Sequence, residues 1–100
     1  MIERRSPEVI GLDGRPRRRE RVLTQRLTGT VVLLNLENGQ YYALNEVGSR
    51  VWEMCDGTRS VAKLASILSS EYAVPHESCQ ADVLGLLQDL ASEKLVVAEG

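Results

Sequence analysis

Alternating apolar positions between residues 30 and 44 predict a β-hairpin. Thr30–Leu36 and Gln40–Leu44 are rich in Val, Leu and Tyr, and a loop containing Asn and Gly separates them. A two-residue turn at Asn38-Gly39 is one way to close this hairpin. A three-residue turn over 37–39, with Gly39 in the left-handed conformation, is the other.

The two turns give different registers, and a slip of one residue exchanges the faces of a strand. The three-residue turn pairs Leu34 with Tyr42 and yields the more apolar face, so we expect this register. Tyr41 then points away from the core. The face expected to pack on the core consists of Val32, Leu34, Leu36, Tyr42 and Leu44.

Apolar spacings of three and four residues begin at residue 45 and predict three helices. Asn45 and Ser60 suit helix N-caps, and Pro75 suits a first helical position. The expected helices span residues 46–55, 61–72 and 75–93. Their apolar stripes are Val47, Val51, Met54 and Cys55; Val61, Leu64, Ala65, Leu68 and Tyr72; and Cys79, Val83, Leu86, Leu87 and Leu90.

Two weaker strand patterns, at residues 21–27 and 95–98, complete an α+β fold. The expected architecture is an N-terminal three-stranded antiparallel sheet, three helices and a short C-terminal strand, an order that resembles a winged helix-turn-helix. Residues 1–20 are rich in Arg, Pro and Gly and have no sustained period. They predict a flexible basic arm, so the folded domain is expected at residues 21–100.

Charge is distributed unevenly, although the net charge of the 100 residues is only -2. Residues 1–28 hold eight Arg against four acids, whereas residues 29–100 hold four basic residues against ten acidic ones. The N-terminus lacks the apolar run of a signal peptide. No segment approaches the roughly 20 apolar residues that span a membrane. The chain is therefore expected to be cytoplasmic, with no membrane partner.

Residues able to carry chemistry are few. His76 is the only histidine, and neither Cys55 nor Cys79 has metal-ligand spacing to it. In a reducing compartment such cysteines are usually buried apolar residues. With no paired nucleophile and base and no phosphate loop, we expect no catalytic residues, no metal and no cofactor. The chain is expected to bind a partner rather than to catalyse a reaction.

Two classes of ligand suit this architecture, duplex DNA and an extended peptide. DNA would meet the third helix, which carries Glu77, Asp82, Asp89 and Glu93. Negative charge there disfavours nucleic acid, whose affinity comes largely from Lys and Arg. A peptide instead needs an uncovered strand edge to which it adds as a further strand.

Four segments resemble the PqqD-like family, the recognition elements of systems that modify ribosomally made peptides. They are GQYYALNEVGSRVWEMCDG at 39–57, SVAKL at 60–64, ADVLGLLQDL at 81–90 and KLV at 94–96. The resemblance covers about residues 30–97, and the long arginine arm departs from it. It implies that the leader of a precursor peptide adds antiparallel to the third strand, against the third helix. It also implies presentation to a maturation enzyme, either a radical-SAM protein or a lasso-type leader peptidase or cyclase.

Transferred to this chain, the resemblance implies a leader-binding site on one strand and one flank of a helix. We expect Asp82, on the opposite flank, to pair locally with an Arg. A winged-helix DNA-binding protein and a structural subunit that docks a partner through the hairpin face remain alternatives. A second copy of the chain is a further partner for an open edge. The expected site residues are Gln40, Tyr41, Tyr42, Ala43, Leu44, Gln80, Leu84, Leu87, Gln88 and Ala91.

Overall fold

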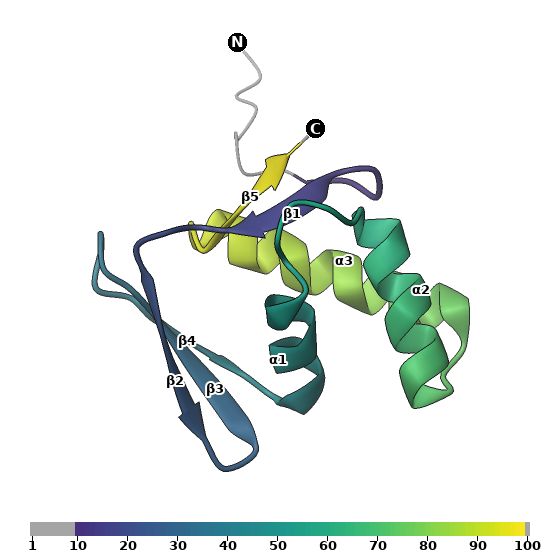
Figure 1. The fold of residues 1–100 in the computed structure, drawn as a ribbon, viewed down its shortest axis with the longest axis horizontal. Helices are drawn as coiled ribbons and strands as arrows, with labels where there is room; N and C mark the ends of the chain where they lie inside the picture. The colour runs from purple at the N-terminus through teal and green to yellow at the C-terminus, as the bar shows by residue number, and fades with distance from the viewer. Residues whose placement is uncertain (1–9, 100) are drawn as a thin grey trace, which may run out of the picture.

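The computed structural model describes residues 10–99, which form two small sheets and three helices (Figure 1). The predicted arm over residues 1–20 lies partly outside the described residues. The strands are β1 (Arg15–Arg18), β2 (Val22–Leu27), β3 (Thr30–Asn35), β4 (Tyr41–Leu44) and β5 (Val96–Glu99). The helices are α1 (Glu46–Glu53), α2 (Val61–Tyr72) and α3 (His76–Ser92).

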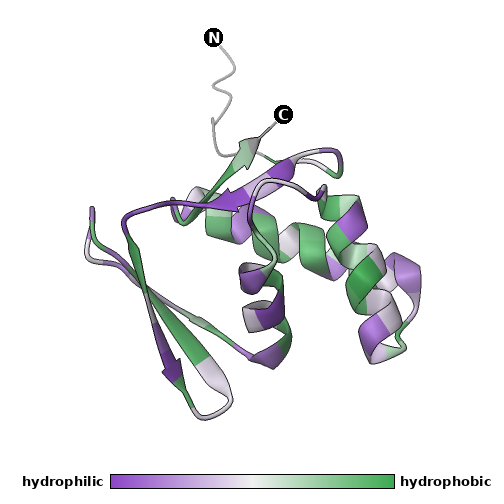
Figure 2. Ribbon diagram, viewed as in Figure 1, coloured by the Kyte–Doolittle hydropathy of each residue, from purple (hydrophilic) through white to green (hydrophobic). Residues whose placement is uncertain are grey.

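The predicted three-stranded antiparallel sheet is present, with the strand order β2-β3-β4. Helix α1 lies between this sheet and the pair formed by α2 and α3 (Figure 1). Hydrophobic residues are concentrated on β3, α2 and α3, whereas β1 is mostly hydrophilic (Figure 2). Their burial in one shared core holds the sheet and the helices together.

Local capping signals place the helices well. The Asn45 side chain accepts a hydrogen bond from the Gly48 amide at 2.8 Å, and the Ser60 hydroxyl accepts one from the Lys63 amide at 3.1 Å. Both contacts satisfy amides that a helix N-terminus leaves without a partner. Helix α2 has the predicted bounds. Helix α1 ends two residues early, and Pro75 is the N-cap of α3 rather than its first residue.

The predicted register of the β3–β4 hairpin is wrong. Leu33 pairs with Tyr42 and Leu34 with Tyr41, and residues 36–40 connect the two strands. As predicted, Gly39 has a positive φ, 74°, and Tyr42 and Leu44 face the core. From β3, however, the core receives Val31, Leu33 and Asn35 instead of the predicted Val32, Leu34 and Leu36.

The physical reason is Asn35, which is polar yet only 2% exposed. Its Nδ2 donates to the backbone oxygens of Glu93 and Lys94, and its Oδ1 accepts from the Glu37 amide. Burying a polar group is tolerated when hydrogen bonds replace those to water. The prediction placed the more apolar face of β3 on the core, whereas the buried face is the one that includes Asn35. The predicted register was wrong for this reason.

The prediction of a flexible arm is wrong for Arg15–Arg18, which forms β1 and pairs antiparallel with β5. Ile10 and Pro16 are buried, and the Gly14 oxygen accepts a hydrogen bond from the Val61 amide at the start of α2. Arg18 donates to the last carbonyls of α1. The sequence concealed this strand because β5, its partner, lies about 80 residues further along the chain.

Candidate functional site

Strand β4 lies at one edge of the three-stranded sheet, and only β3 pairs with it among the described residues. The Asn35 amide donates to the Gln40 oxygen. Because antiparallel pairs alternate, the backbone groups of Tyr42 and Leu44 also face β3. Those of Tyr41 and Ala43 consequently face the open edge. The strand can therefore accept another strand through alternate residues.

A groove of about 460 Å³ runs beside this edge. Its β4 side includes Tyr42, Ala43 and Leu44, and its floor includes Val51 of α1. Gly48 permits the close approach of α1 to β4, because a Cβ there would lie 3.2 Å from Leu44 Cδ2. The groove is thus set by the tight junction at which β4 passes into α1.

The opposite wall belongs to α3, but not to the flank predicted from the sequence. Asp82, Val83 and Leu86 line the groove. The other flank faces the N-terminal segment, since Gln88 Nε2 donates to the Ile10 oxygen at 3.2 Å. The helical spacing correctly identified which residues share a flank. It did not show which flank lies beside β4, and that part of the prediction is wrong.

The predicted residues divide into three groups. The side chains of Gln40, Tyr41 and Ala43 are exposed on β4 or just before it, whereas Tyr42 is half-buried and Leu44 only 2% exposed. On α3, Leu87 and Ala91 are buried in the core. Gln80 and Leu84 are half-buried and Gln88 is exposed, and none of the three lines the groove.

The groove flank of α3 is acidic. Burial raises the pKa of Tyr42, and the carboxylates of Asp89 and Glu93 raise it further. Asp82 is the one charged residue that lines the groove itself. None of the ion pairs found among residues 10–98 includes Asp82, Asp89 or Glu93. The expected pairing of Asp82 with an arginine is therefore not seen in the described part of the chain.

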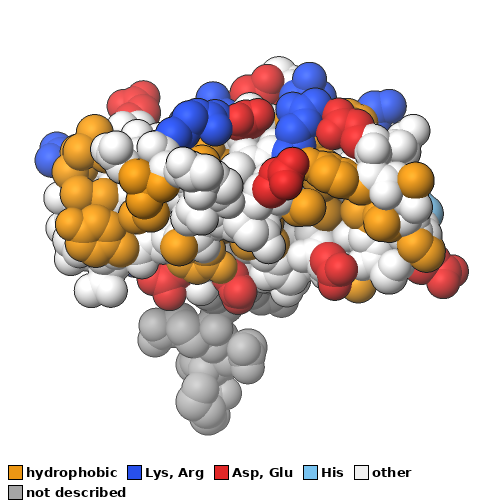
Figure 3. Space-filling model, turned by 90° about the horizontal axis from the view of Figure 1, so that it is seen from below, with side chains coloured by type: hydrophobic (Ala, Val, Ile, Leu, Met, Phe, Trp, Pro, Cys, Tyr) orange, Lys and Arg blue, Asp and Glu red, His pale blue; other side chains and the backbone are white. Residues whose placement is uncertain are grey.

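A second groove of about 460 Å³ shares Val47, Asp82 and Val83 with the first. It lies where α2 ends and α3 begins, and its lining is mainly apolar, including Tyr72 and Val74. Seen from below, hydrophobic side chains cross this face of the molecule, basic and acidic side chains alternate along its upper border, and further acidic side chains lie on its lower border (Figure 3). The groove beside the open edge thus shares part of its lining with a second, mainly apolar groove.

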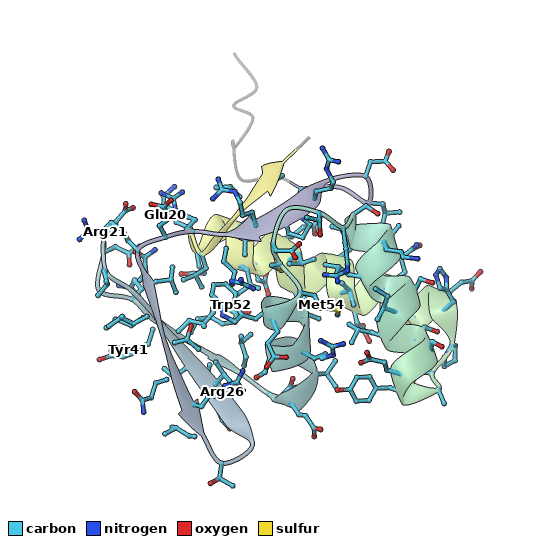
Figure 4. The ribbon with its side chains drawn as sticks, in the orientation of Figure 1. Glu20, Arg21, Arg26, Tyr41, Trp52 and Met54 are labelled. Atoms are coloured by element: carbon cyan, nitrogen blue, oxygen red, sulfur yellow. The ribbon has the colours of Figure 1, made fainter. Side chains whose placement is uncertain are left out.

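The outer face of the sheet is separate from the groove. Tyr41 is 71% exposed and points away from the helices, whereas Trp52 lies between the sheet and the helices (Figure 4). Leu23 and Leu34 are in register with Tyr41 on the same face. Tyr41 therefore does not line the groove, although its backbone belongs to the open edge.

No three His, Cys, Asp or Glu side chains in residues 10–99 come together as metal ligands do. Cys55 and Cys79 are buried and not bonded to each other, and burial raises the pKa of the Cys55 thiol to about 12. None of the helices that the structure describes is long and apolar enough to cross a membrane.

Comparison with known proteins gives three informative similarities. A protein of Bradyrhizobium diazoefficiens named PqqA binding protein is 39% identical over 51 residues, and the chain spans about half the length of that relative. The structure of TbiB1 in complex with the TbiA(beta) leader peptide is 28% identical, with a TM-score of 0.71, and the match covers 80% of this chain and 93% of that one.

The third similarity is to the PqqD truncation of Methylobacterium extorquens PqqCD, described as a functional, stand-alone recognition element. It is 26% identical with a TM-score of 0.73, over 90% of this chain and 96% of that one. The family model of coenzyme PQQ synthesis protein D (PqqD) matches residues 30–96, which contain β3, β4 and all three helices. The chain therefore belongs to the PqqD family.

Proposed function

We propose that this chain captures the leader segment of a ribosomally made precursor peptide and presents it to a maturation enzyme. The observation that carries the proposal is the open edge of β4 beside the groove on α3. A peptide strand that pairs with Tyr41 and Ala43 gains backbone hydrogen bonds whatever its sequence. The similarity to TbiB1, which was solved with a leader peptide, supports this class of ligand.

The added strand would place its alternate side chains on two different surfaces. One set would enter the groove between β4 and α3, and the other would lie beside Tyr41 on the outer face of the sheet. The groove would select the peptide, while the outer face and the bound peptide remain accessible to an enzyme. The role of the chain is then to hold a peptide in a defined geometry, without catalysis of its own.

The enzyme that receives the peptide would be a radical-SAM protein or a lasso-type leader peptidase or cyclase. A second copy of the chain is a competing partner, because an unpaired edge also accepts an identical strand. Sedimentation with and without peptide distinguishes these cases. A dimer that pairs through β4 should dissociate when the peptide binds, whereas a monomer should keep its sedimentation coefficient apart from the added mass.

Proline substitution tests strand addition directly. Ala43→Pro removes an amide that faces the open edge and leaves the β3–β4 hydrogen bonds in place. Thr24→Pro is the matched control, because the alternation in β2 turns the Thr24 amide toward the other edge of the same sheet. The measurement is fluorescence anisotropy of a labelled precursor leader titrated with each protein.

The proposal predicts that Ala43→Pro weakens binding roughly tenfold or more, since a donor is lost and the ring hinders the approach of the strand. Thr24→Pro should bind as the unsubstituted chain does. Circular dichroism should show that both variants keep the fold. Equal affinity for Ala43→Pro and Thr24→Pro would overturn binding by strand addition.

A further inference from the structure

The charge of the groove flank bears on which peptide the open edge accepts. Along this flank lie Asp82, Leu86 and Asp89 of α3 and its C-cap residue Glu93, at intervals of four, three and four residues. Asp82 and Leu86 line the groove, and the other two carboxylates lie close enough to Tyr42 to affect its ionisation. A strand added to β4 would therefore lie between an uncharged strand and an acidic helix flank.

The spacing along α3 matches that of a strand. At about 1.5 Å per residue, Leu86 lies about 6 Å beyond Asp82 along the helix, and Asp89 and Glu93 lie about 10 and 16 Å beyond it. Alternate residues of a strand are about 6.7 Å apart. Three consecutive groove-facing side chains would thus meet Asp82, then Leu86, and then the space between Asp89 and Glu93.

We propose that the groove selects peptides in which a basic, an apolar and a second basic residue occupy alternate positions, an inference that rests on the proposed function. Lys or Arg at the outer two positions would pair with carboxylates that have no ion-pair partner among residues 10–98. The middle side chain would contact Leu86 and Val83 at the groove wall. The pattern reads the same in both directions, so it does not depend on strand polarity.

Electrostatics supports the same ligand on the β4 side. The residues that β4 and α1 contribute to the groove are all uncharged. Ion pairs join four arginines to acids outside this flank: Arg19 to Glu37, Arg26 to Glu53, Arg50 to Glu71 and Arg59 to Asp56. An acidic peptide would meet like charge along α3, and a basic peptide would meet opposite charge. The selectivity would thus come from repulsion as well as attraction.

A displayed library of random 12-residue peptides tests the inference. It is selected in parallel on the unsubstituted chain, on Ala43→Pro, on the triple variant Asp82→Asn/Asp89→Asn/Glu93→Gln and on Glu77→Gln. Glu77 is the matched control, since it lies exposed on α3 but projects to the opposite flank. The readouts are the sequences enriched on each protein and the affinity of one enriched peptide by anisotropy.

The expected result is enrichment of the basic–x–apolar–x–basic pattern on the unsubstituted chain and on Glu77→Gln. Loss of each exposed ion pair should weaken the affinity about two- to fivefold. The triple variant should therefore bind the enriched peptide roughly tenfold more weakly or worse. The difference should shrink as salt is raised. Two outcomes would overturn the charge selection and leave strand addition in place. In the first, the enriched peptides are lost with Ala43→Pro but lack basic residues. In the second, they are lost with Ala43→Pro but bind the triple variant as tightly as the unsubstituted chain. If no enriched peptide is lost with Ala43→Pro, strand addition itself fails.

Discussion

Replacement of Asn35 is expected to destabilise the fold and to loosen the groove. This side chain joins the β3–β4 loop to the end of α3, the two elements that border the open edge. Its Nδ2 lies 3.1 Å from the Lys94 oxygen and 3.3 Å from the Glu93 oxygen, and its Oδ1 lies 2.8 Å from the Glu37 amide. Asn35→Ala removes all three hydrogen bonds and leaves a cavity in their place.

The magnitude follows from those three contacts. A net contribution of about 0.5–1.5 kcal/mol for each gives a total of roughly 2–4 kcal/mol. A domain of this size has a total stability of about 5–15 kcal/mol. The loss should therefore lower the melting temperature by roughly 10–25 °C. The same variant should bind a leader peptide less tightly, because β4 is no longer held at a fixed distance from the end of α3.

Urea unfolding, followed by circular dichroism and by the fluorescence of the buried Trp52, measures this loss. Asn38→Ala is the matched control, since this exposed side chain in the same loop accepts one hydrogen bond, from the Gln40 amide. It should cost less than about 1 kcal/mol. An Asn35→Ala variant within about 0.5 kcal/mol of the unsubstituted chain, or an Asn35→Leu variant of greater stability, would refute the reasoning.

Three further predictions concern the supports of the site. Asn45→Ala removes the acceptor of the Gly48 amide and should cost about 1 kcal/mol in urea unfolding, whereas Asn45→Asp should retain most of the stability. Arg18→Met should cost roughly 1–2 kcal/mol, because the guanidinium hydrogen bonds to two α1 carbonyls are lost; an unchanged unfolding midpoint would show that this contact adds nothing. Burial raises the pKa of Cys55 from 9.0 to about 12. In a Cys79→Ala variant this thiol should therefore react at pH 8 only when the protein unfolds. The free energy of unfolding should fall as pH rises from 9 toward 12, because the thiol ionises more readily in the unfolded chain. Rapid labelling of the native protein would contradict its burial.

The helices were predictable because their signals are local. Helix α2 begins after Ser60 and ends at Tyr72, where the apolar spacing ends, and no distant residue is needed to place either end. Asn45 fixes the start of α1 in the same way. The position of β4 at the sheet edge also followed from the order of the strands. The starts and ends of these helices depend on residues within a few positions of one another.

The errors share a different origin, because each depends on a contact between residues distant in sequence. The burial of Asn35 depends on carbonyls 58 and 59 residues away, so no local rule favours its register. Strand β1 needs β5 as its partner. The side of α3 that faces the N-terminal segment is marked by the contact of Gln88 with Ile10, 78 residues apart. Sequence periodicity identified the buried stripe of α3 and left undetermined which of its two flanks lies beside β4.

The uneven charge of the sequence gains a physical explanation in the structure. Two arginines of the basic N-terminal part form ion pairs with the body of the domain, Arg19 with Glu37 of the hairpin loop and Arg26 with Glu53 of α1. These contacts neutralise both acids. Those arginines are therefore engaged with the body of the domain. The carboxylates on the groove flank of α3 receive no such partner within residues 10–98, so the surface beside β4 stays negative. A polyanion such as duplex DNA would be repelled from the helix that a winged helix-turn-helix would use to read it. A basic peptide strand gains from the same charges, which is why the groove and its electrostatics favour one class of ligand.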